Sequence, residues 1–257
     1  MSEEFKFKGF WGSKQLRPFV EYSRGSTHFC IYCGSIADTR EHVPSKAFLN
    51  DPLPSDLPTL PTCYKCNNSF SADELYTNTY IECVKTFSET NNSDVLEIQN
   101  TDRKEVKEAK LAVKQAFANG VFPKDERIER ILCKLALGHI VYKLSRCYNF
   151  NSFQNAGINY TFKCAIDHNT WESLETIEQI NDEVLPEIGS RAFENIFILE
   201  ACSFNNSVND CSVHQLFMDW TDIQDGVYRY IAFYNDSDIA VKMVIRDYLY
   251  AEIRLPG

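Results

Sequence analysis

Two Cys-x-x-Cys pairs constrain this chain more than any other feature of its sequence. Cys30 and Cys33 form the first pair, and Cys63 and Cys66 form the second. Each such turn directs two sulfurs at one ion, so two turns can supply the four thiolates of a closed, tetrahedral, structural zinc site. The 29 residues between the pairs exceed the roughly 15–20 of a simple zinc ribbon. The sequence therefore predicts a zinc-stapled module that carries an insert.

The rest of the composition indicates a cytoplasmic protein with reduced thiols. Residues 1–4 are acidic and are not followed by the apolar run of a secretory signal. No stretch approaches the roughly 18 apolar residues of a membrane span, so we expect no membrane partner. The six cysteines outside the two pairs are scattered through the chain. We interpret them as buried free thiols rather than as a disulfide framework.

Charge is distributed unevenly along the chain, whose net charge is −10. Residues 1–50 hold seven Lys/Arg and five Asp/Glu, and residues 103–134 hold nine and five. Residues 151–257 hold six Lys/Arg against seventeen Asp/Glu. Because a phosphate backbone needs cationic contacts, a nucleic-acid surface is predicted in the first half only. The acidic last third is a candidate for docking a protein partner or for self-association.

Sequence patterns predict the following elements. Residues 27–46 suggest two short strands, and four prolines make residues 50–62 a loop. A helix is expected at or just after Cys66 and onward to Phe87, with a capping box at Ser71–Glu74. Further helices are expected at 102–118, which Asn119-Gly120 ends, at 125–148 and around 170–180. Strands are expected at 196–201, 213–220, 227–234 and 239–253.

The insert and the second cysteine pair place three polar residues near the expected zinc ion. His42 can take a proton from water near neutral pH, as a hydrolytic general base must. Glu41 precedes it and, on a strand, points to the opposite face; it is either a ligand of a divalent ion or a solvated charge beside Arg40. Asn67 directly follows the last cysteine, where its amide oxygen can bind Mg²⁺. The alternative for Asn67 is a helix cap, and Asn68 is a second candidate for the ligand.

These motifs resemble a known family. The segments Cys30-Ile-Tyr-Cys33, Glu41-His42-Val-Pro44 and Cys63-Tyr-Lys-Cys66-Asn67 resemble the HNH endonucleases, the zinc-bearing ββα-metal nucleases, and in particular the junction-resolving phage members. The resemblance implies two strands and a helix around the site. It implies that His42 activates water, and that Glu41 and Asn67 hold one catalytic Mg²⁺ or Mn²⁺ ion. Products with 5′-phosphates and a role in phage defence or mobile elements are also implied.

Two positions depart from the family pattern. The family usually has Asp where this chain has Glu41, and it has a middle asparagine that orients the histidine. Asn50, Thr59 or the backbone alone could orient His42 here. Glu74 could reach the metal, but a cap or a surface position is the preferred interpretation for it.

Together these features predict an α+β protein in three parts. Residues 1–95 form the HNH-like nuclease module with its structural zinc, 96–150 form a basic helical connection, and 151–257 form an acidic domain rich in antiparallel strands. The predicted function is metal-dependent hydrolysis of nucleic-acid phosphodiester bonds, with DNA favoured over RNA. The alternative is a catalytically inactive zinc module that binds nucleic acid or a protein partner.

Overall fold

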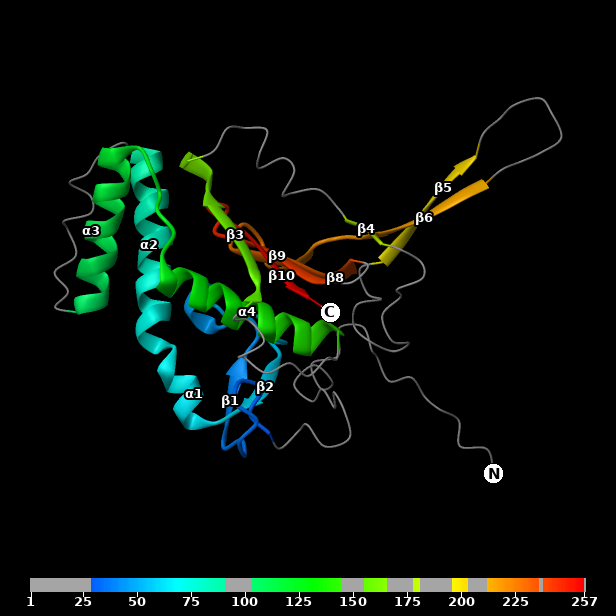
Figure 1. Cartoon of the computed structure of the whole chain (residues 1–257), viewed down its shortest axis with the longest axis horizontal. Coiled ribbons are helices and arrows are strands. Elements are labelled where there is room, and N and C mark those ends of the chain that lie inside the picture. The colour runs from blue at the N-terminus through cyan, green and yellow to red at the C-terminus, as the bar shows by residue number, and fades with distance from the viewer. Residues whose placement is uncertain are drawn as a thin grey trace.

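The computed structural model describes residues 29–90, 103–144, 155–165, 178–180, 196–202, 212–235 and 238–256 (Figure 1). This part of the chain combines helices with antiparallel sheets, which confirms the predicted α+β class. No helix within it is long and apolar enough to cross a membrane. The expected residues 145–148 of the second long helix and the N-terminal 28 residues lie outside the described residues.

A five-stranded antiparallel sheet dominates the C-terminal half, and its order is β3-β10-β9-β8-β7. Its strands are β3 (Gly157–Phe162), β7 (Thr221–Gln224), β8 (Tyr228–Asn235), β9 (Asp238–Ile245) and β10 (Leu249–Pro256). A short 3-10 turn, η5 (Lys163–Ala165), follows β3. A smaller sheet of order β4-β6-β5 comprises β4 (Glu178–Ile180), β5 (Ile196–Cys202) and β6 (Ser212–Met218). The expected β-rich C-terminal region is therefore present.

Two sequence expectations in this region are wrong. Residues 178–180 were expected at the end of a helix, but they pair with β6 as a strand. The single strand expected at 239–253 is a hairpin, because Arg246 and Asp247 adopt left-handed φ angles of 55° and 56° that turn the chain. Asp tolerates this conformation, whereas arginine seldom adopts it. The sequence therefore offered little sign of the turn, and the alternating pattern alone predicted one continuous strand.

One helix lies at the centre of the molecule. α4 (Glu126–Leu144) is buried along most of its length, and it packs against β8, β9 and β10 on one side and against α2 (Ser71–Thr90) on another. α3 (Lys104–Asn119) packs on α2, and its buried residues are Val106, Ala109, Val113 and Ala116. Gly120 ends α3 with a φ of 65°, as its position predicts. In Figure 1, α4 runs across the five-stranded sheet, between that sheet and the β1–β2 pair.

The N-terminal module has the element order strand, strand, helix. β1 (Thr39–His42) pairs antiparallel with β2 (Thr59–Thr62), and α1 (Tyr64–Ser69) follows directly. η2 (Lys46–Phe48) lies in the insert between the strands and packs on α2. The two strands expected within residues 27–46 do not pair with each other as a hairpin. The described residues of this range instead form an isolated bridge between Phe29 and Ile36, followed by β1. The loop expected at 50–62 ends in β2 instead, because Pro61 can occupy an edge strand, where the missing N–H is tolerated.

The helix after the second cysteine pair also differs from its prediction. It begins at Tyr64 rather than at or just after Cys66, because the Cys63 sulfur caps it by accepting from the Cys66 N–H at 3.4 Å. Phe70 ends α1, and α2 begins at Ser71. The expected capping box does not form: the Glu74 carboxylate pairs with Lys134, and the Glu74 N–H donates to the Phe70 carbonyl.

Candidate metal centre and adjoining polar site

The four predicted cysteines meet in space. The Sγ atoms of Cys30, Cys33, Cys63 and Cys66 all lie within 4.8 Å of one another. Four sulfurs about 2.3 Å from one tetrahedral zinc ion lie about 3.8 Å apart, and the Cys33 and Cys63 sulfurs are 3.7 Å apart. The cluster could therefore hold a metal ion such as zinc, which agrees with the donor set predicted for the structural site.

Backbone hydrogen bonds shape the turn that carries Cys30 and Cys33, which we call the first knuckle; the turn of Cys63 and Cys66 is the second. The Cys30 N–H donates to Ser35 O at 2.7 Å, and the Gly34 N–H donates to Cys30 O at 2.8 Å. Gly34 has a φ of 73°, which a residue with a Cβ rarely adopts. The Ile31 N–H donates to Pro61 O at 3.1 Å, so the first knuckle is fastened to β2, directly beside the second.

Without a metal, the thiols of the cluster have divergent pKa values. Hydrogen bonds from Ser35 lower the pKa of Cys33 to about 6, whereas burial raises the pKa of Cys30. Burial, then hydrogen bonding to the neighbouring sulfurs, raises the pKa of Cys66. Cys33 can therefore be a thiolate near neutral pH by itself, whereas deprotonation of Cys30 and Cys66 requires a positive charge at the centre of the group. A divalent ion that deprotonates its thiol ligands would supply it.

His42 ends β1 and is half-buried. Burial, then the positive charges of Lys46 and Arg40, lowers the pKa of His42 to about 4. The imidazole is therefore neutral at pH 7 and has a lone pair that can accept a proton. The Val43 N–H donates to Pro58 O at 2.9 Å, and both Cγ atoms of Val43 lie near Gly138 of α4. The backbone around His42 is thus held by β2 and by the central helix.

Glu41 points away from His42, into the protein, as strand alternation predicts. Its side chain is 9% exposed, and its carboxylate lies 3.3 Å from the ammonium of Lys134, which is 2% exposed. Lys134 also forms an ion pair with Glu74 of α2. Burial raises the pKa of Glu41, and Lys134 opposes that rise. The three side chains form a buried cluster with two carboxylates and one ammonium, which we call the Glu41–Lys134–Glu74 cluster.

The aromatic residues around this cluster are buried as well. The Lys134 ammonium lies 5.1 Å from the centre of the Phe70 ring, and Tyr32 packs against the same ring at 5.0 Å. Burial, then the charges of Glu41 and Glu74, raises the pKa of Tyr32 well above its usual value. The apolar walls keep water from the ion pairs, which makes those pairs depend on one another.

Lys134 is the residue that the sequence interpretation missed. It stands in the apolar run Ile-Leu-Cys-Lys-Leu-Ala-Leu of α4. A lysine in a helix that is apolar all round is seldom buried without a partner, so this position signalled an internal ion pair. The identity of the partners was not readable, because they lie 60 and more residues earlier in the chain.

The structure also locates the other candidates named from sequence. The Asn67 amide nitrogen lies 3.5 Å from the Arg40 carbonyl oxygen, so α1 places Asn67 beside β1. Thr59 is the register partner of His42, but its hydroxyl accepts from Arg40 Nε at 2.7 Å. The Asn50 side chain accepts from Arg246 at 2.8 Å. Thr59 and Asn50 thus have partners other than the imidazole, while Asn68 is exposed on α1.

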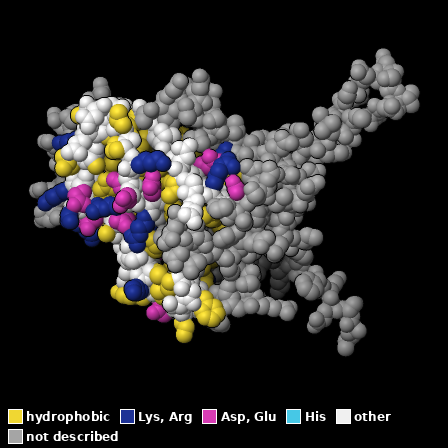
Figure 2. All heavy atoms as spheres, in the orientation of Figure 1, with side chains coloured by type: hydrophobic (Ala, Val, Ile, Leu, Met, Phe, Trp, Pro, Cys, Tyr) yellow, Lys and Arg dark blue, Asp and Glu magenta, His cyan; other side chains and the backbone are white. Residues whose placement is uncertain are grey.

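The basic helices carry fewer free charges than their composition indicates. Arg127 pairs with Glu108 and Asp73, Arg130 pairs with Asp73, and Lys104 pairs with Glu108. Figure 2 shows acidic and basic side chains intermingled on this face of the molecule, in the part where α2, α3 and α4 lie. These pairs lower the net positive charge that the helices offer to a phosphate backbone.

Comparisons with protein-family models, with curated proteins and with solved structures found no match to this chain.

Proposed function

We propose that this protein is a metal-dependent endonuclease that hydrolyses phosphodiester bonds of nucleic acid, with DNA as the favoured substrate. The observation that supports the proposal best is the joint placement of the cysteine cluster and the polar residues. The cluster joins the knuckle before β1 to the cap of α1, so His42 and Asn67 belong to one stapled strand–strand–helix unit. That unit has the element order of a ββα-metal nuclease.

In this proposal zinc has a structural role. The four sulfurs would hold it as a closed site, in which no coordination position remains for substrate. Its contribution is folding free energy, because the unfolded chain has no preformed site.

His42 is the proposed general base. Its neutral imidazole accepts a proton from the attacking water, and β2 and α4 hold its backbone in place. A phosphate beside the ring would raise the low pKa of His42, because its negative charge offsets Lys46 and Arg40. Substrate binding would thereby make the imidazole a stronger base when it is needed.

Glu41 and Asn67 are the proposed ligands of a Mg²⁺ or Mn²⁺ ion, which when bound would stabilise charge on the phosphate and on the leaving oxygen. Their oxygen donors suit such hard cations. Glu41 is paired with Lys134, so its carboxylate must be shared with or released from that ammonium. Because the cluster has two carboxylates for one ammonium, it retains a net negative charge that favours a second cation.

The pairing of Glu41 with Lys134 also supports a second candidate function. If Glu41 does not leave Lys134, the module has no acidic ligand for a catalytic ion. The protein would then be a zinc module that binds nucleic acid or a protein partner without cleaving it.

One cleavage and binding assay separates the two candidates. Supercoiled plasmid, single-stranded DNA and RNA are incubated with wild type, His42→Ala and Asn67→Ala in Mg²⁺ or Mn²⁺, with Asn68→Ala as the matched control. We expect wild type and Asn68→Ala to cleave, and His42→Ala to lose about 100-fold or more of the rate, in the range of general-base catalysis. Wild type that binds these substrates and cleaves none of them would refute the nuclease proposal.

A further inference from the structure

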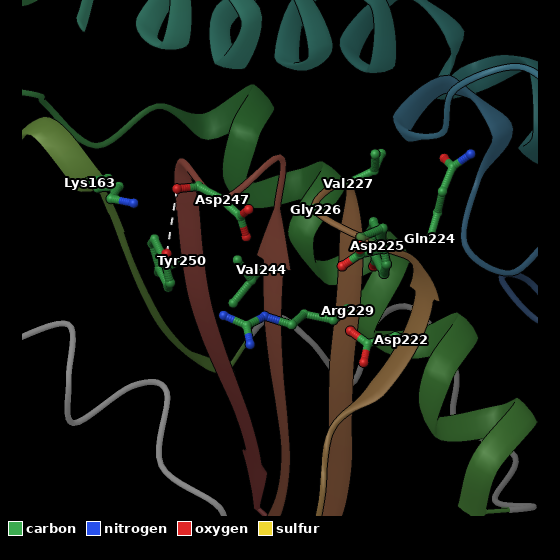
Figure 3. A pocket seen from close by; sticks show the side chains of 11 residues that line it. Lys163, Asp222, Gln224, Asp225, Gly226, Val227, Arg229, Val244, Asp247 and Tyr250 are labelled. Carbon is green, nitrogen blue, oxygen red and sulfur yellow. Dashed lines mark hydrogen bonds between the residues drawn. The ribbon is translucent and has the colours of Figure 1, made fainter. Parts of the chain in front are cut away.

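A pocket of about 400 Å³ opens on the five-stranded sheet, far along the chain from the cysteine cluster (Figure 3). Strand register explains which residues form its floor: Asp222 pairs with Arg229, Arg229 with Val244, and Val244 with Tyr250. These four residues therefore form a row across β7, β8, β9 and β10. Neighbouring residues Tyr228 and Tyr230 contact His139 of α4, so Arg229, between them, lies on the other face of the sheet.

The walls of the pocket are held in place by hydrogen bonds. Gln224 accepts from the Asn50 N–H at 2.8 Å and donates to the Asn50 carbonyl at 3.0 Å. The Arg246 N–H donates to Val227 O at 2.7 Å, which joins the turn after β7 to the turn after β9. The Tyr250 hydroxyl donates to Asp247 O at 3.4 Å, the bond drawn in Figure 3. Because these residues are already held in place, ligand binding would cost little conformational entropy. The volume of the pocket is within the roughly 300–1,000 Å³ of small-molecule sites.

Charges of both signs line the pocket and are separated across it. Figure 3 shows the Lys163 amine on the β3 side, and the Arg229 guanidinium extending toward β10. The carboxylates of Asp222 and Asp225 lie on the β7 side, and the Asp247 carboxylate points between the two groups. A simple anion would face three carboxylates and a simple cation would face two basic groups, whereas a molecule with both charges matches both sides.

We propose that this pocket binds a small zwitterion of the amino acid or short-peptide class. The carboxylate of the ligand lies toward Lys163 and Arg229, and its ammonium lies toward Asp225 and Asp222. A nucleotide fits less well, because the aromatic residues of the lining, Tyr228 and Tyr250, are each 1% exposed and leave no ring face for a base. The volume, at the small end of the range, matches an amino acid or a dipeptide.

Isothermal titration of the full chain tests the proposal, without metal or nucleic acid, so its outcome is independent of the proposed nuclease. The probes are a panel of free L-amino acids and unblocked dipeptides. Both groups are zwitterions, and comparing their affinities shows whether the pocket binds an amino acid or a short peptide. For each compound that binds, its N-acetylated form and its C-terminal amide are titrated as well. We expect at least one compound to bind, and each blocked form, which lacks one charge, to bind at least tenfold more weakly.

Two variants with exposed substitutions test the location of the site. Asp225→Asn and Lys163→Gln each remove one charge from opposite sides of the pocket, and both side chains are exposed, so the fold is expected to persist. Each should weaken binding at least tenfold. Arg254→Gln, on β10 but outside the lining, is the matched control and should bind as wild type does. The proposal is overturned if no compound binds, if blocked forms bind equally well, if both pocket variants bind like wild type, or if only inorganic phosphate or a nucleotide binds.

Discussion

Replacing Lys134 by methionine tests the buried cluster that adjoins His42. Methionine keeps the length of the side chain and removes its charge, so Glu41 and Glu74 lose their shared ammonium. Removing one partner of a buried ion pair costs about 3–5 kcal/mol, because the remaining charge stays in a medium of low polarity. For a chain of this size, that loss corresponds to a melting temperature lower by about 6–20 °C.

Lys104→Met is the matched control. Lys104 lies 3.5 Å from Glu108, but these side chains are 79% and 37% exposed, and solvent screens an exposed pair of this kind so that it contributes little to stability. Chemical denaturation of both variants and wild type at pH 7 measures the two losses. The same kind of substitution should therefore differ several-fold in cost between the two sites.

The pH dependence of the Lys134→Met loss gives a second measurement. Burial raises the pKa of Glu41 above its unfolded value, and removing the Lys134 ammonium removes the charge that opposes this rise. Such a group destabilises the fold when charged, so the loss is largest at pH 7 and shrinks as the pH falls toward about 5. A loss below about 1 kcal/mol, or one that is equal at both pH values, would refute the buried-cluster reasoning.

Three further predictions follow from single sites. Cys63→Ser should lose bound zinc, measured by elemental analysis, and should become more sensitive to protease around the knuckles, because metal binding supplies folding energy; full zinc content would contradict the four-sulfur site. Burial lowers the pKa of His139 to about 3, whereas a histidine in the unfolded chain titrates near pH 6.5. As the pH falls below about 6.5 the unfolded state takes up a proton that the folded state does not, so the folded state loses stability. Wild type should lose about 2 kcal/mol from this residue between pH 7 and pH 5, and His139→Gln, compared by urea denaturation, should lack that part of the dependence. Gly120→Ala should destabilise by about 1 kcal/mol because of its φ of 65°, whereas Gly138→Ala in α4, whose Cβ would meet Val43 at 3.5 Å, should be neutral or stabilising by up to about 1 kcal/mol; the opposite order of the two variants in thermal melts would contradict this assignment.

Local sequence signals predicted much of this fold. The spacing of the four cysteines indicated their cluster, and helical periodicity located α3 and α4 with their buried faces. These features could be predicted because helical periodicity is a short-range repeat, and because two Cys-x-x-Cys pairs have few interpretations other than a metal site. Strand alternation likewise indicated that Glu41 and His42 face opposite ways.

The misses have a common physical cause, which is contact between distant parts of the chain. Pro61 argued against a strand, yet pairing with Arg40 across the insert makes it one. Glu74 matched a cap by its spacing, but Lys134, 60 residues later, determines where its carboxylate lies. Asn50 was a candidate to orient His42, and its partner Arg246 lies 196 residues away. Short-range patterns contain no information about such partners.

The position of β10 has a consequence for synthesis of the protein. β10 lies between β3 and β9 and is hydrogen-bonded to both, although it is translated after both of them. Until residues 249–256 emerge from the ribosome, β3 has no partner in this sheet, and α4 lacks part of the surface on which it packs. Because domains fold as units during translation, we expect a nascent chain that stops at residue 248 to remain open to protease along α4. A growing chain would then complete the surface that covers α4 only after this strand has been synthesised.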